Sequence, residues 1–218
     1  MLSRGLADPY LALADNRPVG YGAVLNKHDK GRLTEFYVVP SFRVAAALLF
    51  RDLLAVSGAT HVEAQTNLPQ MLFMLLDFTT NIRAENILFD DAFTSSIPCP
   101  GGVFRRAEPD DAARMFPHRD EPVGDWVIDA VGGIVATGGF LCHYNPPYGD
   151  IYMEVAEHAR GRGYGSYLVQ EVKRVCYEAG KRPAARCNAD NTASRRTLEK
   201  AGLLPCARLL VGDVVSHR

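Results

Sequence analysis

Three glycines on alternate residues form the stretch of this chain best suited to chemistry. Gly161, Gly163 and Gly165 are preceded by an apolar, strand-like run, residues 150–155. A helix-like run, residues 167–179, follows them. Glycine lets a backbone turn tightly and come close to a ligand. The N–H groups that open the following helix point outward at the positive end of its dipole, which favours an anion. The stretch predicts a phosphate-binding turn, with an ordinary strand-to-helix turn as the alternative.

The five cysteines indicate neither a metal site nor a disulfide framework. They are an odd number at irregular spacing, without a CxxC pair. Cys142 and Cys187 are interpreted as small buried hydrophobic side chains rather than nucleophiles, because no serine, histidine and aspartate set accompanies them. We predict no metal cofactor and a reducing, cytoplasmic setting.

The composition is that of an ordinary globular protein. Of the 218 residues, 47% are hydrophobic and 22% are charged, and the formal net charge is −1. This balance gives no reason to expect electrostatic binding to nucleic acid. The longest apolar runs, residues 44–50 and 71–76, are too short to cross a bilayer, and residues 1–10 hold no apolar signal core. We expect no nucleic-acid or membrane partner, and a monomer or homodimer.

Turn-forming residues divide the chain into two halves. Residues 94–102 are rich in serine, proline and glycine and lack periodicity, so we interpret them as a linker. The predicted domains are residues 1–97 and 98–218. Hydrophobic periodicity predicts the elements of each half. Before the linker we expect strands over 10–14, 19–25, 33–39 and 61–65, helices over 44–56 and 71–78, and a strand or hairpin over 85–93. After it we expect strands over 103–107, 126–131, 134–143, 150–155, 184–188 and 207–215, and helices over 167–179 and 191–201.

The same order of elements occurs before and after the linker, which indicates an internal duplication. Residues 38–43 can be laid on residues 155–160. This alignment puts Ala46 and Leu48 opposite the second and third glycines of the later copy. Side chains at these places would crowd a phosphate, so we expect the first half to be a degenerate copy that binds no phosphate ligand.

The second half resembles the GCN5-related N-acetyltransferases, the GNAT superfamily. The central signature of the family, Gln/Arg-x-x-Gly-x-Gly/Ala, is matched by Arg160, Gly163 and Gly165. Residues 104–112 are similar to the first strand and helix of the family, and residues 191–203 to its fifth strand and fourth helix. Three motifs in the right order over about half of the chain are a specific signal. The whole chain then looks like a tandem GNAT protein.

The resemblance implies a mixed α/β fold with a splayed, mostly antiparallel sheet flanked by helices, present twice with an incomplete N-terminal copy. It also implies acetyl-CoA as co-substrate, with its pantetheine arm along one strand and its pyrophosphate at the glycine turn. The cofactor-binding residues that the resemblance implies are Met153, Val155, Arg160, Gly161, Arg162, Gly163, Tyr164, Gly165, Ser166 and Asn191. For Asn191, a helix-capping role is an equal alternative.

Acetyl transfer to an amine needs a base that takes a proton from the ammonium group. Glu154 is the acidic residue nearest the expected thioester and is a candidate for this role. Strand alternation places Glu154 with Tyr152, opposite Ile151 and Met153, unless a β-bulge shifts the alternation. The alternative for Glu154 is a buried acid held in a structural ion pair or hydrogen bond.

His143 and Tyr144 end the third strand of the second half, beside the expected cleft, and are further catalytic candidates. A histidine there titrates near neutral pH. Many family members carry a tyrosine seven residues after the asparagine, where it protonates the departing thiolate; here that position is Leu198. Tyr164 or Tyr144 is then the alternative acid, or the thiolate leaves without one.

The predicted function is acetyl-CoA-dependent N-acetyl transfer, by direct attack, to a primary amine of a small molecule or peptide. Asp120, Glu121 and Asp125 favour a cationic substrate, or else form a solvated loop. A non-catalytic acyl-CoA-binding sensor or interaction module is the alternative, because the family's tyrosine is missing. A Rossmann-type oxidoreductase fits less well, since no acidic residue ends a following strand at the usual spacing.

Overall fold

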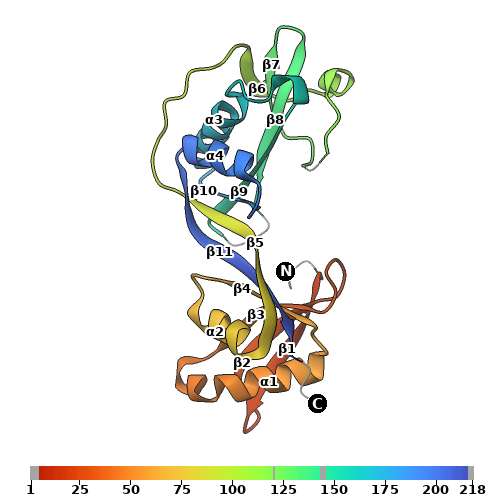
Figure 1. Ribbon diagram of the computed structural model, residues 1–218, viewed down its shortest axis with the longest axis vertical. Helices are drawn as coiled ribbons and strands as arrows, with labels where there is room; N and C mark the ends of the chain where they lie inside the picture. Colours follow the sequence, from red (N-terminus) through yellow and green to blue (C-terminus); the bar gives the residue numbers. More distant parts are fainter. Residues whose placement is uncertain (1–4, 120, 143–145, 216–218) are drawn as a thin grey trace. The chain divides into compact units, whose positions relative to one another are not determined.

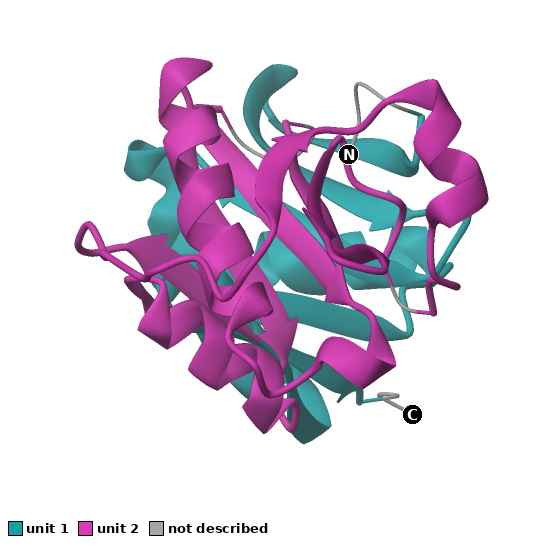
Figure 2. Cartoon of the chain, turned by 90° about the horizontal axis from the view of Figure 1, so that it is seen from above, with its two compact units in different colours: residues 1–86, 207–218 teal, residues 87–206 magenta. Residues whose placement is uncertain are grey.

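The structure is a computed structural model that describes residues 5–119, 121–142 and 146–215. The chain forms two compact units (Figure 2): residues 1–86 with 207–218, and residues 87–206. This division differs from the expected boundary at residue 97, because the last strand belongs to the first unit. Strand pairing is the physical reason, since residues 209–213 pair antiparallel with residues 61–65.

The first unit is a sheet accompanied by two helices. Its elements, labelled in Figure 1, are β1 (Ala7–Ala14), β2 (Arg17–Leu25), β3 (Arg32–Val38), a 3₁₀ helix (Pro40–Ala45), α1 (Ala46–Ser57), β4 (His61–Gln65) and α2 (Pro69–Phe78). Their order in the sheet is β1-β2-β3-β4, with β11 (Leu203–Val214) beside β4. Phe50 of α1 and Leu75 of α2 are fully buried with Leu33 and Val62 of the sheet. These side chains form the core of the unit.

The second unit carries the glycine turn. Its elements are β6 (Val103–Arg106), a 3₁₀ helix (Pro109–Arg114), β7 (Trp126–Ala130), β8 (Gly133–Leu141), β9 (Tyr148–Val155), a 3₁₀ helix (Glu157–Ala159), α3 (Tyr164–Glu178), β10 (Arg182–Asn188) and α4 (Thr192–Lys200). Their sheet order is β10-β9-β8-β7-β6, with β5 (Thr79–Asp91) beside β10. β9 and β10 pair in parallel, and β6 to β9 form an antiparallel meander.

The predicted mixed α/β class, a mostly antiparallel sheet flanked by helices, is confirmed. β5 is one long strand, not a hairpin, and it begins six residues before the expected start at residue 85. The first part of β5 does not show the alternation of apolar and polar residues that marks a strand, because polar residues there form ion pairs. Arg83 lies 3.3 Å from Asp213, and Glu85 lies 2.8 Å from Arg32. Within the described residues, each helix is too short or too polar to cross a bilayer.

Each unit contains one pair of parallel strands that separate after a short region of pairing. β9 pairs with β10 only as far as Ile151, opposite Ala185, although the strands continue to Val155 and Asn188. In the first unit, the pairing of β3 with β4 is limited to Arg32 and Leu33. A 3₁₀ helix and then an α-helix follow each splayed strand, so the order of elements repeats as the sequence pattern predicted.

α3 packs on one face of the sheet in the second unit through a narrow apolar stripe. Leu168, Val172 and Cys176, spaced four residues apart, are fully buried, and Ile151 of β9 belongs to the same core. Because Ile151, Met153 and Val155 alternate with Asp150, Tyr152 and Glu154, the second set lies on the face of β9 away from α3. The two faces of one strand therefore have different surroundings.

A buried lysine fastens α3 to its neighbours. Lys173 forms an ion pair with Asp91 of β5, and its Nζ donates to the carbonyl oxygens of Phe93 and Ala201 at 2.9 Å. One turn further along α3, the Tyr177 hydroxyl donates to Asp91 at 2.5 Å. A buried charge needs such partners, and removing one of them is strongly destabilising. The helix that begins at the glycine turn is thus held in place along its length.

Candidate functional site

The glycine turn has backbone angles that require glycine at two positions. Gly161 has a φ of 75° and Gly163 a φ of 93°, both in the left-handed region that other residues rarely adopt. Gly163 is the N-cap of α3. Arg160 closes the turn on itself, because its Nε donates to the carbonyl oxygen of Val155 at 3.1 Å. The conformation, and not only the lack of side chains, distinguishes this turn.

Gly165 allows close packing in the first turn of α3. A Cβ atom on Gly165 would lie 3.1 Å from Cγ2 of Thr197, 3.3 Å from Cε of Met153 and 3.5 Å from Cγ2 of Val155. These atoms belong to α4 and β9, so the start of α3 lies close to both elements. A larger residue at this position would require the neighbouring side chains, Thr197 first, to shift by a few tenths of an ångström.

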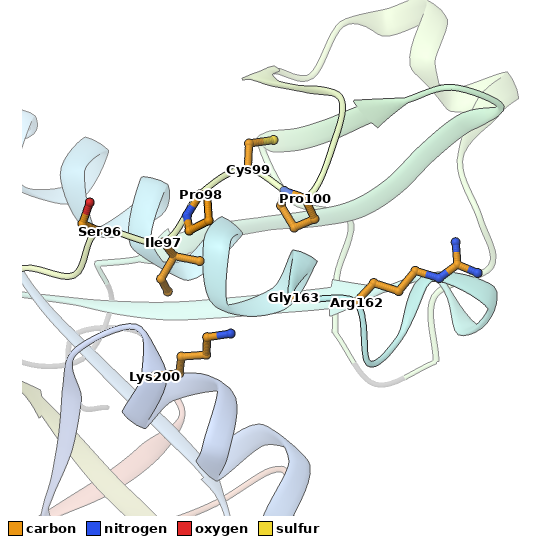
Figure 3. A pocket seen from close by; sticks show the side chains of 8 residues that line it. All are labelled: Ser96, Ile97, Pro98, Cys99, Pro100, Arg162, Gly163 and Lys200. Atoms are coloured by element: carbon orange, nitrogen blue, oxygen red, sulfur yellow. The ribbon is translucent and has the colours of Figure 1, made fainter.

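The start of α3 is suited to binding an anion. The first four N–H groups of an α-helix have no acceptor within the helix, and they carry a partial positive charge. Here they belong to the residues from Gly163 onward, directly after the left-handed turn. Arg162 directly precedes Gly163, and its side chain extends away from the start of α3 (Figure 3). A phosphate group fits this arrangement of donors.

The splay of β9 and β10 provides a second feature that a ligand can use. Within the described residues, the pairing of β9 with β10 ends at Ile151, and further along β9 the carbonyl oxygen of Val155 accepts from Arg160. An unpaired strand edge pairs readily with an extended ligand that carries amide groups. This edge, from Tyr152 to Val155, leads directly to the glycine turn. An amide-bearing arm and a phosphate can therefore be bound in succession.

A cavity of about 320 Å³ lies beside the start of α3 (Figure 3). Its lining combines a stretch of the linker with two cationic residues and the N-cap glycine. The lining residues are Ser96, Ile97, Pro98, Cys99, Pro100, Arg162, Gly163 and Lys200. The cations and the helix start are suited to a phosphorylated group, and the prolines and Ile97 to an apolar one.

The Gln170 side chain of α3 binds the linker. Oε1 of Gln170 accepts from the N–H of Ile97 at 2.6 Å, and Nε2 donates to the carbonyl oxygen of Ile97 at 3.2 Å. The amide side chain thus pairs with the linker as a neighbouring strand would. The predicted linker is an ordered wall of the cavity.

Asn191 acts as a helix cap in the structure. Its Oδ1 accepts from the N–H of Ser194 at 3.0 Å, at the start of α4. This geometry agrees with the capping alternative. The hydrogen bond from Ser194 uses one lone pair of Oδ1. The expected role of Asn191 in cofactor binding stays a prediction.

Glu154 lies on the face of β9 away from α3, where it binds a loop. β8 and β9 pair in register from Asp150 to Val155, without the β-bulge that would have turned Glu154 to the other face. Glu154 is buried, and its carboxylate accepts from the backbone N–H groups of Arg119 and Glu121 at 3.1 to 3.2 Å. The carboxylate therefore holds the loop between the 3₁₀ helix and β7 on the sheet.

Thr137, the neighbour of Glu154 on β8, holds the same loop. Its hydroxyl lies 2.7 Å from Nε2 of His118 and accepts from the N–H of Gly124 at 3.3 Å. Nδ1 of His118 lies 3.0 Å from the carbonyl oxygen of Phe116, and the two rings stack. With Nδ1 donating to this carbonyl, Nε2 accepts from Thr137. The loop that the sequence marked as a substrate loop is thus anchored at several points.

Two residues of β9 that sequence reasoning missed share this face. Burial, and then the charge of Glu121, raises the pKa of Asp150 to about 7. Burial, followed by the charges of Asp125 and Glu121, raises the pKa of Tyr152. The phenol packs against Gly139 of β8, where a Cβ would lie 2.8 Å from its oxygen. Alternation with Glu154 placed both residues on this face, but burial could not be read from the sequence.

The other residues considered as acids or bases lie in different parts of the second unit or outside the described residues. His143 and Tyr144 lie outside the described residues. Tyr164 is buried in the core of the second unit, and its hydroxyl points to Gly101 of the linker. Leu198, at the position of the family's tyrosine, is also buried in that core. Among the described residues, no group of three His, Cys, Asp or Glu side chains suited to a metal ion is present.

The first unit lacks the left-handed turn. The N-cap of α1 is Ala45, with a φ of −94°, and no residue of the preceding 3₁₀ helix is a glycine. Aligning the starts of α1 and α3 pairs Ala45 with Gly163, one residue away from the expected pairing with Ala46. The helix starts thus differ in backbone conformation as well as in side chains.

Solved structures with a similar fold are acetyltransferases. An acetyltransferase of the GNAT family from Colwellia psychrerythraea is 15% identical, with 97% of this chain and 87% of that chain covered and a TM-score of 0.77. A GCN5-related N-acetyltransferase from Sphaerobacter thermophilus is 19% identical, with coverage of 94% and 80% and a TM-score of 0.57. A tandem GNAT protein from the clavulanic acid biosynthesis pathway is 13% identical, with coverage of 97% and 84% and a TM-score of 0.58. At these identities the likeness concerns the fold alone.

No curated protein matches the chain in sequence. The family model described as acetyltransferase (GNAT) family matches residues 89–203. The matched region contains the splayed strands, the glycine turn and the capped helix α4. Because it spans slightly more than half of the 218 residues, the protein belongs to the GNAT family of acetyltransferases.

Proposed function

We propose that the protein is an acetyl-CoA-dependent N-acetyltransferase that acts on a primary amine of a small molecule or a peptide. The observation that carries the proposal is the continuity between the splayed edge of β9 and the left-handed glycine turn at the start of α3. This order matches the order of groups in coenzyme A, whose amide-bearing arm is followed by a pyrophosphate. The start of α3 would hold the pyrophosphate, and Met153 to Val155 would pair with the arm.

The residues at the start of α3 match acetyl-CoA in two respects: they carry positive charge for its phosphates and they leave room beside the glycine turn. Gly163 has a φ that excludes most side chains, and Gly165 lets α3 lie close to α4 and β9. Arg162 and Lys200 supply positive charge beside a cavity of about 320 Å³. We assign the phosphorylated nucleoside end of coenzyme A to this cavity. Bound acetyl-CoA supplies the activated acetyl group.

Glu154 has a positioning role in this proposal rather than the role of base. Its carboxylate accepts from two backbone N–H groups of the loop and cannot leave them without leaving these donors unpaired. The loop then carries Glu121 and Asp125 to the side of the sheet on which an amine would approach.

A sensor that binds acyl-CoA without catalysis is the second candidate. Leu198 is buried where a family tyrosine would stand, which favours this alternative. The two functions are separated by measuring thiol release from acetyl-CoA over a panel of primary amines, together with calorimetric binding of coenzyme A. We expect thiol release that depends on the amine, with the N-acetylated product identified by mass spectrometry. Binding without turnover on any amine would instead support the sensor.

A further inference from the structure

The structure places a partly buried carboxyl group at the point where β9 and β10 separate. Asp150 pairs with Ala184, and the next pair, Ile151 with Ala185, is the last before the strands diverge. The Asp150 side chain is only 17% exposed. It lies on the face of β9 that also carries Tyr152 and the anchored loop. Of the two acidic side chains of β9 on this face, Asp150 is nearer than Glu154 to the point of separation.

We propose that Asp150 is the general base that takes the proton from the attacking amine. This inference rests on the proposed acetyl transfer and deepens it. A protonated primary amine would approach Asp150 from the loop side and transfer one proton to its carboxylate. The nitrogen lone pair then forms the C–N bond with the acetyl carbon, and the C–S bond breaks with its electrons leaving on sulfur. The second ammonium proton goes to the thiolate, and Asp150 returns its proton to water.

The surroundings of Asp150 suit this role because they weaken its acidity. Burial and the like charge of Glu121 raise the pKa of Asp150 from its usual 3.8 to about 7. A rise of this size makes the carboxylate about a thousandfold stronger as a base. A base with a pKa near the working pH is both sufficiently ionised and sufficiently basic. An ordinary exposed aspartate lacks this combination.

Charged groups of opposite sign act on Asp150. Glu121 raises its pKa, whereas Arg186 of β10, whose Nε lies 3.4 Å from the carboxylate, acts in the opposite direction; burial and Glu121 prevail. Among the described residues, the titratable and charged groups on this side of the sheet include His118, Arg119, Glu121 and Asp125 of the loop, Tyr148, Tyr152 and Glu154 of β9, and Arg182 and Arg186 of β10. Glu121 and Arg186 can therefore be used to shift the titration of Asp150 in both directions.

The test is the pH profile of kcat/KM for acetyl transfer by the full chain to an amine accepted by the wild type. We expect kcat/KM to rise with pH and to level off near pH 7 as Asp150 becomes ionised. Asp150→Asn should lower kcat/KM about 100-fold or more and remove this inflection. Coenzyme A affinity, measured by calorimetry, should stay unchanged, because α3 and the glycine turn lie on the other face of the strand.

Two further variants distinguish a base from a merely structural acid. Glu121→Gln should move the inflection to lower pH, and Arg186→Gln should move it to higher pH by roughly 0.2–0.7 units, the effect of a partly exposed ion pair. A structural role for Asp150 would not shift the profile in opposite directions.

Three results would overturn the inference. A wild-type rate and inflection in Asp150→Asn would show that another group is the base, while leaving acetyl transfer itself in place. Inflections that stay fixed in both charge variants would have the same meaning. Coenzyme A binding without transfer to any amine by the wild type would remove the proposed function, and the role of Asp150 with it.

Discussion

Glu154 and Asp150 lie four residues apart on the same face of β9, yet their surroundings give them different tasks. Glu154 accepts several backbone N–H groups from the loop, and such bonds stabilise a carboxylate in place. Asp150 is partly buried near another acid, which raises its pKa to about 7. The sequence pointed to Glu154 as the acidic residue nearest the expected thioester. It could not indicate which of the two acids is bound by a loop 35 residues away.

At this scale we predict that Asp150→Asn stabilises the fold at pH 8 more than at pH 5. The native pKa of about 7 lies above the usual 3.8, so between these values the folded chain holds a proton that the unfolded chain has released. The contribution of Asp150 to the unfolding free energy therefore falls as the pH rises from about 4 to about 7, by at most about 4 kcal/mol. Asparagine does not titrate, so the variant lacks this pH-dependent loss of unfolding free energy. Urea unfolding of both proteins at the two pH values measures it, and an equal difference at pH 5 and pH 8 would contradict the prediction.

At the scale of elements, α3 joins the features on which the proposed site depends. Its first turn follows the glycine turn, its apolar stripe packs on the sheet, and Gln170 attaches the linker. The stripe and the glycine turn were predictable because they depend on residues close together in sequence. The role of Gln170 was not, because its partner Ile97 is 73 residues away.

We expect Gln170→Leu to release the linker from α3 and to open one wall of the cavity. The N–H and C=O groups of Ile97 would lose their partner, and coenzyme A should bind about tenfold more weakly, a loss of about 1.4 kcal/mol. Acetylated pantetheine, which lacks the nucleoside end, should keep its affinity. The alkylation rate of Cys99, which lines the cavity, reports the release directly.

Glu178→Gln is the matched control for this prediction, because Glu178 lies at the far end of the same helix and pairs with Arg174. It should change neither Cys99 alkylation nor coenzyme A affinity. Equal effects of Gln170→Leu on coenzyme A and on acetylated pantetheine would mean that the linker does not line the nucleoside site.

At the scale of the whole molecule, the chain repeats one order of elements with one glycine turn. Strand, strand, splayed strand, 3₁₀ helix, helix, strand, helix and strand occur from β1 to β5 and again from β7 to β11. This order could be predicted, because hydrophobic periodicity and turn residues are local signals. The division into units could not, because it depends on the pairing of residues 209–213 with β4, far away in sequence.

The difference between the repeats leads to the proposal that only one of them binds coenzyme A. The N-cap of α1, Ala45, has a φ of −94°, whereas the N-cap of α3, Gly163, has a left-handed φ of 93°. Without the left-handed turn, the amides at the start of α1 are not arranged as they are at the start of α3. The first repeat would then complete the fold without carrying a cofactor.

Calorimetric titration of the full chain with coenzyme A measures how many of the repeats bind it. We expect one binding site per chain in the wild type. We expect no measurable binding in a folded Gly163→Val variant, because valine rarely adopts the φ that this turn requires. Two equivalent sites per chain, or wild-type affinity in the Gly163→Val variant, would contradict this expectation.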